Sequence, residues 1–307
     1  MTPTLSHCLL MVGEVQSHVI LCDDPFNCNG QDVIICITGN PGVVDFYKEF
    51  ALELHNRTKL PVCVIGHAGH EVVPHEKSNH MKGQEHMFDL EGQLKHKVDF
   101  IYTYIDPRSK LHLIGHSIGA WLILEMLQDH ERICNRVSSV NLLFPTLHQL
   151  ANTKNGRFIN NFVKTFHRIV IFLFFLAYLL PDCILFFFVK LYLKLNLSYS
   201  MHNFIGVNKL LNVVVGEKIL FLAYDEMSTV KEMNVAVINK IKHMTNIIYG
   251  TKDGWVPVSY MKELKQLEPD IQMIEVDIDH AFVMKSSKPI SKLVAQYINT
   301  ITGKSTD

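Results

Sequence analysis

The chain has 307 residues, enough to bury a large hydrophobic core, and it carries 29 Lys and Arg against 30 Asp and Glu. This balance provides no basic field to hold a polyanion, which argues against a nucleic-acid partner. The seven cysteines are scattered without a C-x-x-C pair, so they indicate reduced thiols on the cytosolic side rather than disulfides or a zinc site. The N-terminal segment has no basic region and only a short apolar run, so we expect no signal peptide.

Short apolar strands alternate with helical patterns along the chain. This alternation predicts an α/β fold in which helices cover a mostly parallel sheet. The expected strands are 33–37, 61–65, 111–115, 138–143, 245–249 and 271–276, and the expected helices are 46–57, 90–105, 117–129, 257–267 and 286–300.

The segment 168–195 breaks this alternation with two apolar runs. The runs, 169–180 and 183–189, are separated by Pro181 and Asp182, and each is shorter than the roughly 20 residues that cross a bilayer. A single helix through both runs would be kinked by the proline and would place Asp182 near the bilayer centre, at a cost of about 2.5 to 3.5 kcal/mol.

We therefore predict that 169–189 inserts into one lipid leaflet as a hairpin with both ends in the cytosol. The flanking basic residues Arg168, Lys190 and Lys194 suit a headgroup boundary. A buried pair of cap helices is the alternative, because apolar runs of this length are often core helices. The sequence suggests a test that replaces four aromatic residues by Asp, namely Phe174, Phe175, Phe186 and Phe187.

The stretch GHSIG, residues 115–119, follows an expected strand and opens an expected helix. This placement fits a nucleophile elbow, in which flanking glycines allow a sharp turn that projects the Ser117 hydroxyl. The backbone N–H of Ile118 then points toward a developing oxyanion. A second donor is expected after an early strand, where Gly39 allows close approach and Asn40 offers its N–H. The alternative for this second stretch is a plain turn around Asn-Pro.

A nucleophilic serine needs a base and an acid, in the chain order Ser, Asp, His. Asp253 and His280 each follow a late expected strand, so they should reach the same sheet edge as Ser117. His280 would take the Ser117 proton, while Asp253 holds the imidazole in one tautomer. The alternatives are a surface histidine and a turn aspartate. The rival carboxylates for the acid are Asp225, Asp277 and Asp279.

The histidines gathered in the first third of the chain match neither H-E-x-x-H nor a zinc-finger pair, so we expect no metal site. They are His67, His70, His75, His80 and His86. The expected chemistry also needs no cofactor. His116, next to the serine, is expected to pack or to make a structural hydrogen bond.

With these motifs in place, the sequence resembles the lipid-droplet-associated hydrolases, a branch of the serine α/β-hydrolases. The matching blocks, in chain order, are GNPG (39–42), FY (46–47), HAGH (67–70), LEGQLKHK (90–97), GHSIGA (115–120), LLFPT (142–146), NG (155–156), YGTKDGWVPVSY (249–260) and HAFV (280–283).

The resemblance implies a single α/β-hydrolase domain over 1–307, with a divergent helical cap at 157–240 that includes the hairpin 169–189. It also implies the triad Ser117, Asp253 and His280. Its further implications are hydrolysis of neutral lipid esters, with sterol esters suggested, and a place on lipid droplets and the cytosolic face of the endoplasmic reticulum.

Two other functions stay open from the sequence. The chain could be a droplet or membrane scaffold that keeps the hydrolase fold with little turnover, because a fold does not prove an activity. It could also be an acyltransferase or thioesterase, because another nucleophile can resolve the same acyl-enzyme. Protein partners are not indicated by any motif.

Overall fold

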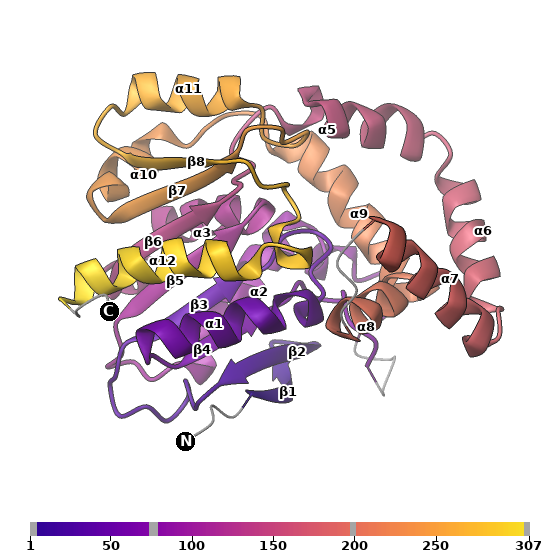
Figure 1. The fold of residues 1–307 in the computed structure, drawn as a ribbon, viewed down its shortest axis with the longest axis horizontal. Coiled ribbons are helices and arrows are strands. Elements are labelled where there is room, and N and C mark those ends of the chain that lie inside the picture. Colours follow the sequence, from indigo (N-terminus) through magenta and orange to yellow (C-terminus); the bar gives the residue numbers. More distant parts are fainter. Residues whose placement is uncertain (1–4, 74–78, 197–200, 304–307) are drawn as a thin grey trace.

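The computed structural model describes residues 5–73, 79–196 and 201–303. Within these ranges, eight strands form one sheet in the order β1-β2-β4-β3-β5-β6-β7-β8 (Figure 1). The strands are β1 (Leu5–Val12), β2 (Val15–Cys22), β3 (Val33–Ile37), β4 (Val62–Ile65), β5 (Leu111–His116), β6 (Val137–Leu143), β7 (Thr245–Gly250) and β8 (Gln272–Val276). The strands expected from 33 onward are all present, within a residue or so of their predicted ends.

The strands β3 to β8 run parallel, as the alternation with helices predicts. The strands β1 and β2 were not predicted from the sequence. They form an antiparallel hairpin, and β2 also pairs antiparallel with β4. Gly13 opens the two-residue connection with φ 57°, a left-handed conformation that glycine adopts without steric cost. This hairpin extends the sheet at one edge and lies far in sequence from Ser117.

Helices cover both faces of the sheet (Figure 1). One core packs the sheet against α1 (Lys48–Thr58) and α12 (Ser287–Thr302). The other core packs it against α2 (Leu90–Tyr104), α3 (Ile118–Asp129), α10 (Val235–Ile241) and α11 (Val258–Leu267). Successive residues of β3 point alternately into the two cores, because side chains alternate across a strand. The predicted α/β architecture is confirmed.

The chain between β6 and α10 is largely helical in its described parts and lies to one side of the sheet (Figure 1). Its elements before α10 are η4 (Leu150–Asn152), α5 (Lys154–Phe158), the π-helical η5 (Ile159–Val163), α6 (His167–Tyr178), α7 (Asp182–Asn196), α8 (Met201–Leu210) and α9 (Val213–Thr229). The two apolar runs form α6 and α7, with the break at Pro181 that the sequence predicts.

Shorter helices connect the remaining elements. They are η1 (Val44–Tyr47), η3 (Glu85–Met87), α4 (Glu131–Cys134), η6 (Lys242–Met244) and η7 (Phe282–Met284). None of the described helices is by itself long and apolar enough to cross a bilayer. The pair Lys154–Val163 and His167–Tyr178, bent by 88°, passes that test by length and composition alone.

Candidate active site

Ser117 lies at the sharp turn between β5 and α3, with φ 54° and ψ −120°. A positive φ is rare for a residue with a side chain, and such strain persists where surrounding structure imposes it. A Cβ on Gly115 would lie 2.6 Å from the backbone N of Ala120, and one on Gly119 would lie 2.5 Å from the Ile37 carbonyl oxygen. Both glycines are therefore required sterically, as the motif GHSIG predicts.

The structure brings Ser117, His280 and Asp253 together from the ends of β5, β8 and β7. Ser117 Oγ lies 2.9 Å from His280 Nε2, and His280 Nδ1 lies 2.6 Å from Asp253 Oδ2. The other Asp253 oxygen accepts the N–H groups of Trp255 and Val256, at 2.7 and 3.1 Å. The Asp253 carboxylate is buried and held on both oxygens, so it can orient the imidazole and stabilise its protonated form.

Two of the rival carboxylates are engaged elsewhere. Asp225, on α9, accepts the Leu90 N–H at 2.8 Å and so caps the start of α2. Asp277 forms an exposed ion pair with Lys252, at 3.2 Å. Among the described carboxylates, the one hydrogen-bonded to the His280 ring belongs to Asp253.

The loop 39–42 after β3 packs directly against the serine, because a Cβ on Gly39 would lie 3.0 Å from Ser117 Cβ. Gly39 N–H donates to Tyr47 Oη at 2.8 Å, and Gly42 N–H donates to His70 Nδ1 at 3.0 Å. The N–H groups of Asn40 and Ile118 donate to no acceptor within the described residues. Both expected donors thus belong to segments that adjoin Ser117, and their N–H groups have no other acceptor among the described residues.

A buried chain of hydrogen bonds, which we call the relay, runs from this loop through Tyr47 and His116 to the backbone of the base, His280. His116 Nε2 lies 3.0 Å from the His280 carbonyl oxygen, which can only accept, so this nitrogen carries the proton. His116 Nδ1 therefore accepts the Tyr47 hydroxyl, at 2.6 Å. Burial, and to a smaller extent the charge of neighbouring His280, lowers the pKa of His116 to about 3, so its ring is neutral. The expected structural role of His116 is confirmed, whereas the role of Tyr47 was not deduced from the sequence.

Replacing Tyr47 by Phe tests this relay. The change leaves the Gly39 N–H and His116 Nδ1 without their shared partner, so we expect the unfolding free energy to fall by about 1 to 3 kcal/mol. We also expect kcat for a soluble ester to fall about 10-fold, because the oxyanion loop loses a fixed contact. Urea unfolding and ester kinetics measure both. Tyr249→Phe, which removes an exposed hydrogen bond to Glu275, is the matched control and should change neither; equal stability of Tyr47→Phe and wild type would contradict the relay.

An open polar pocket of about 700 Å³ adjoins the base and its acid. It is bounded by α5, by the loop after β7 and by the loop after β8, and its lining includes Arg157, Asp253 and His280. Asn155 N–H donates to the Gly254 carbonyl oxygen at 3.0 Å, which fastens α5 to the Asp253 loop. The pocket gives the His280 side of the site a polar route to solvent.

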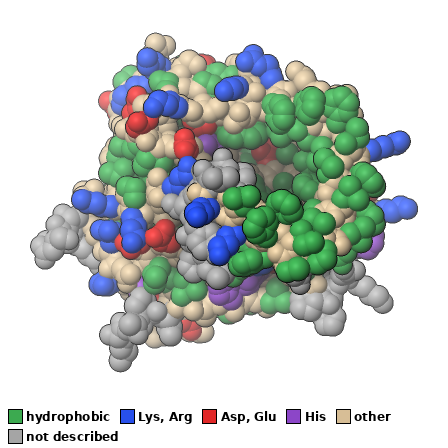
Figure 2. All heavy atoms as spheres, turned by 45° about the vertical axis from the view of Figure 1, so that its right-hand side comes forward, with side chains coloured by type: hydrophobic (Ala, Val, Ile, Leu, Met, Phe, Trp, Pro, Cys, Tyr) green, Lys and Arg blue, Asp and Glu red, His purple; other side chains and the backbone are tan. Residues whose placement is uncertain are grey.

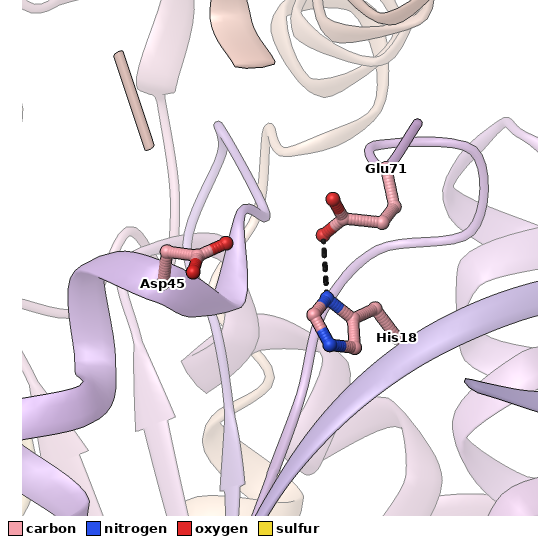
Figure 3. Close-up of side chains that lie close together, drawn as sticks. All are labelled: His18, Asp45 and Glu71. Carbon is pink, nitrogen blue, oxygen red and sulfur yellow. Dashed lines mark hydrogen bonds and ion pairs between the residues drawn. The ribbon is translucent and has the colours of Figure 1, made fainter. Parts of the chain in front are cut away.

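A second cluster of polar side chains joins α8 to the rest of the fold. His18 of β2, Asp45 of η1 and Glu71 after β4 converge with ligand atoms within 4.8 Å of one another (Figure 3). Lys209 of α8 forms ion pairs with both Asp45 and Glu71. The ammonium group thus supplies the positive charge that these carboxylates require, and the cluster clamps α8 by ion pairing. Of the histidines singled out in the sequence, His75 lies outside the described residues.

A strained serine elbow, with Asp and His at neighbouring parallel strand ends of one sheet, defines the class: a serine hydrolase of the α/β-hydrolase fold. Solved structures share that fold. The 2-hydroxy-6-oxo-6-phenylhexa-2,4-dienoate hydrolase from Rhodococcus aligns with a TM-score of 0.67 and 11% identity, covering 97% of this chain and 100% of the other. The thioesterase domain from the curacin biosynthetic pathway aligns with a TM-score of 0.63 and 14% identity, covering 95% and 99%.

A family model described as lipid-droplet associated hydrolase matches residues 30–283. The chain belongs to this family, which confirms the resemblance found in its motifs. The Drosophila melanogaster protein named lipid droplet-associated hydrolase is 38% identical, over 87% of this chain and 89% of its own length. The Mus musculus protein of the same name is 30% identical, over 94% and 93%.

Proposed function

We propose that this protein hydrolyses neutral lipid esters, sterol esters among them, through Ser117, His280 and Asp253. The observation that carries the proposal is the hydrogen-bonded chain from the Ser117 hydroxyl through the His280 ring to the Asp253 carboxylate. We place this activity at the surface of lipid droplets and of the endoplasmic reticulum, facing the cytosol. The names of the fly and mouse relatives support the droplet.

The proposed reaction has two halves. Ser117 Oγ attacks the ester carbonyl carbon while His280 Nε2 takes its proton, and the resulting oxyanion accepts the N–H groups of Asn40 and Ile118. His280 then gives the proton to the leaving alcohol, which produces an acyl-enzyme. Water attacks the acyl carbonyl carbon while His280 takes its proton, and His280 then gives that proton to Ser117 Oγ as the bond to the acyl group breaks and the free acid leaves. Apart from water, every group in this scheme belongs to the chain or the ester, so the scheme uses no cofactor.

An exposed apolar surface on α5, η5, α6 and α7 supports action at a lipid interface. Figure 2 shows apolar side chains gathered on this side of the molecule. Soluble monomers rarely expose a large contiguous patch of this kind. We call it the apolar surface and define it by Phe158, Phe162, Phe166, Ile169, Phe172, Leu173, Phe175, Leu176, Tyr178, Leu179, Leu180, Ile184, Phe187, Phe188 and Leu191.

We propose that α6 and α7, as the hairpin 169–189, enter one lipid leaflet through this surface. The side chains of α6 are all at least partly exposed, which favours the lipid-facing arrangement over a buried cap pair. The exposed residues Arg168, Lys190 and Lys194 flank the hairpin, and their charged ends can stay at the headgroups. The site would then lie beside the lipid from which its substrate comes.

Labelling with a fluorophosphonate probe tests the proposed chemistry. The probe reacts with an activated serine, so wild type should label and Ser117→Ala should not. Ser228→Ala, which removes an exposed serine on α9, is the matched control and should label fully. Equal labelling of wild type and Ser117→Ala would overturn the assignment of the nucleophile. Analysis of the products from a sterol ester in the presence of a second alcohol then separates hydrolysis, which releases free acid, from acyl transfer, which forms a new ester.

A further inference from the structure

The oxyanion loop 39–42 is held from two sides. Its ends are tied to the body of the fold, where Gly39 donates to Tyr47 and Gly42 donates to His70. Its middle is tied to α9, because Asn40 Nδ2 donates to the Ile219 carbonyl oxygen at 3.1 Å and to Glu226 Oε1 at 2.9 Å. The next residue is proline, which has no N–H to fix the chain. The orientation of Asn40 therefore depends on contacts from a helix almost 190 positions further along the chain.

We propose that Glu226 is a positioning residue for the oxyanion hole. Its carboxyl oxygen accepts the Asn40 amide and so directs the Asn40 backbone N–H toward the oxygen on which charge develops. This role rests on the proposed function, and it acts through Asn40 rather than by contact with the ester. Hydrogen-bond donors to an oxyanion are effective when they are oriented before the reaction, so a support for such a donor affects kcat more than substrate binding.

The charge state of Glu226 matters to this role. The residue is only 5% exposed. Burial raises the pKa of Glu226 to about 8, because the opposing effect of the hydrogen bond from Asn40 is smaller and the nearby Asp225 adds to the increase. At neutral pH the carboxyl is protonated and places no negative charge next to Asn40. Above that pKa it ionises, and a carboxylate next to the donor residue opposes the negative oxyanion.

The other titratable groups that face α9 contact residues of this helix other than Glu226. Asp89, which caps α2, acts on Asp225, while His167 and Lys164, from α6 and the turn before it, contact the Tyr224 phenol. On α9 itself, Lys218 lies over the Phe88 ring. The charged group that acts on Glu226 within the described residues is thus Asp225, its neighbour in sequence.

Kinetics with p-nitrophenyl butyrate, a small soluble ester, test the proposal. We expect Glu226→Ala to lower kcat about 10- to 100-fold with KM within about twofold, because a donor is misdirected rather than removed. Glu226→Gln keeps an acceptor of the same shape and should stay within about threefold of wild type at pH 7. Glu217→Ala removes an exposed glutamate from the same helix and should have no effect. Circular dichroism checks that each variant is folded.

The pH profile separates positioning from a purely structural role. From pH 7 to pH 9.5 the wild-type kcat should fall about 10-fold as Glu226 ionises, whereas Glu226→Gln, which cannot ionise, should keep its value. A Glu226→Ala kcat equal to wild type would overturn the role, as would a Glu226→Gln no better than Glu226→Ala or identical pH profiles for wild type and Glu226→Gln. A wild type without Ser117-dependent turnover would instead overturn the proposed function, and this role with it.

Discussion

Replacing Asp253 by Asn should lower kcat for a soluble ester by about 10³ to 10⁴ while the protein stays folded. The Asp253 carboxylate accepts a hydrogen bond from His280 Nδ1, 2.6 Å away. This bond keeps the ring proton on Nδ1 and leaves Nε2 free to take the Ser117 proton. An asparagine amide can present a donor to Nδ1, which places the ring proton on Nε2 and disables the base. His280→Ala removes the base itself and should lose at least as much. Steady-state kinetics with p-nitrophenyl butyrate measure kcat for both variants.

The rival carboxylates provide matched controls for this prediction. Asp225→Asn, Asp277→Asn and Asp279→Asn make the same chemical change, and each should keep kcat within about threefold of wild type. Asp225 caps α2 and Asp277 pairs with exposed Lys252, so their loss affects local stability rather than the base. A loss at Asp225 comparable to that at Asp253, with folding intact, would move the acid to α9.

The parallel sheet and the triad could be predicted because both follow from local patterns. Continuous apolar strands such as 33–37 indicate a sheet covered on both faces, and the strand ends of such a sheet meet at one edge. Ser117, Asp253 and His280 each follow the carboxyl end of a parallel strand, so the sheet itself brings them to one edge. The strained turn at Ser117 could also be predicted from a local pattern, because Gly115 and Gly119 flank the serine as the nucleophile-elbow motif requires.

The supports of the site could not be predicted, because they depend on contacts between distant segments. Glu226 reaches Asn40 across 186 positions, and His116 reaches the His280 carbonyl across 164. No periodicity or spacing rule signals such pairs. Tyr47 lies in a short helix only eight positions after Gly39, yet it resembles any core aromatic until the sheet places His116 against it. The N-terminal hairpin was not predicted because most apolar residues of its first strand form one short run, Cys8 to Val12, without the alternation that marks a half-exposed strand.

The segment 167–196 shows a different limit of sequence reasoning. Its apolar residues occur on all sides of α6 and α7, so the pattern alone does not separate inward from outward side chains. In the structure, Phe174 lies against α9, where a Cβ on Gly216 would meet its ring, and Phe186 packs against Phe204. The four phenylalanines selected for replacement from the sequence therefore include two packed residues besides the exposed Phe175 and Phe187. Loss of lipid binding in that variant would not distinguish unfolding from loss of the apolar surface.

The exposed positions give a sharper test of lipid binding. We expect the quadruple variant Phe172→Asp, Phe175→Asp, Phe187→Asp and Phe188→Asp to lose at least about 100-fold in partition onto lipid droplets, because each buried phenylalanine contributes about 1.5 to 3 kcal/mol. These four side chains are 55, 45, 60 and 56% exposed, so their replacement leaves the packing of the fold intact. Flotation with triolein droplets covered by a phosphatidylcholine monolayer measures the partition.

A control with the same charge change separates the apolar surface from a general effect of added aspartates. Met11, Tyr102, Leu267 and Ile301 are 49, 47, 50 and 42% exposed and lie outside the helices α5 to α7, so their replacement by Asp should leave flotation unchanged. Both variants should still label with fluorophosphonate, since neither alters a residue that contacts Ser117. If the Phe variant floats as well as wild type, or if it aggregates and loses all labelling, α6 and α7 belong to the protein core and the lipid-facing hairpin is wrong.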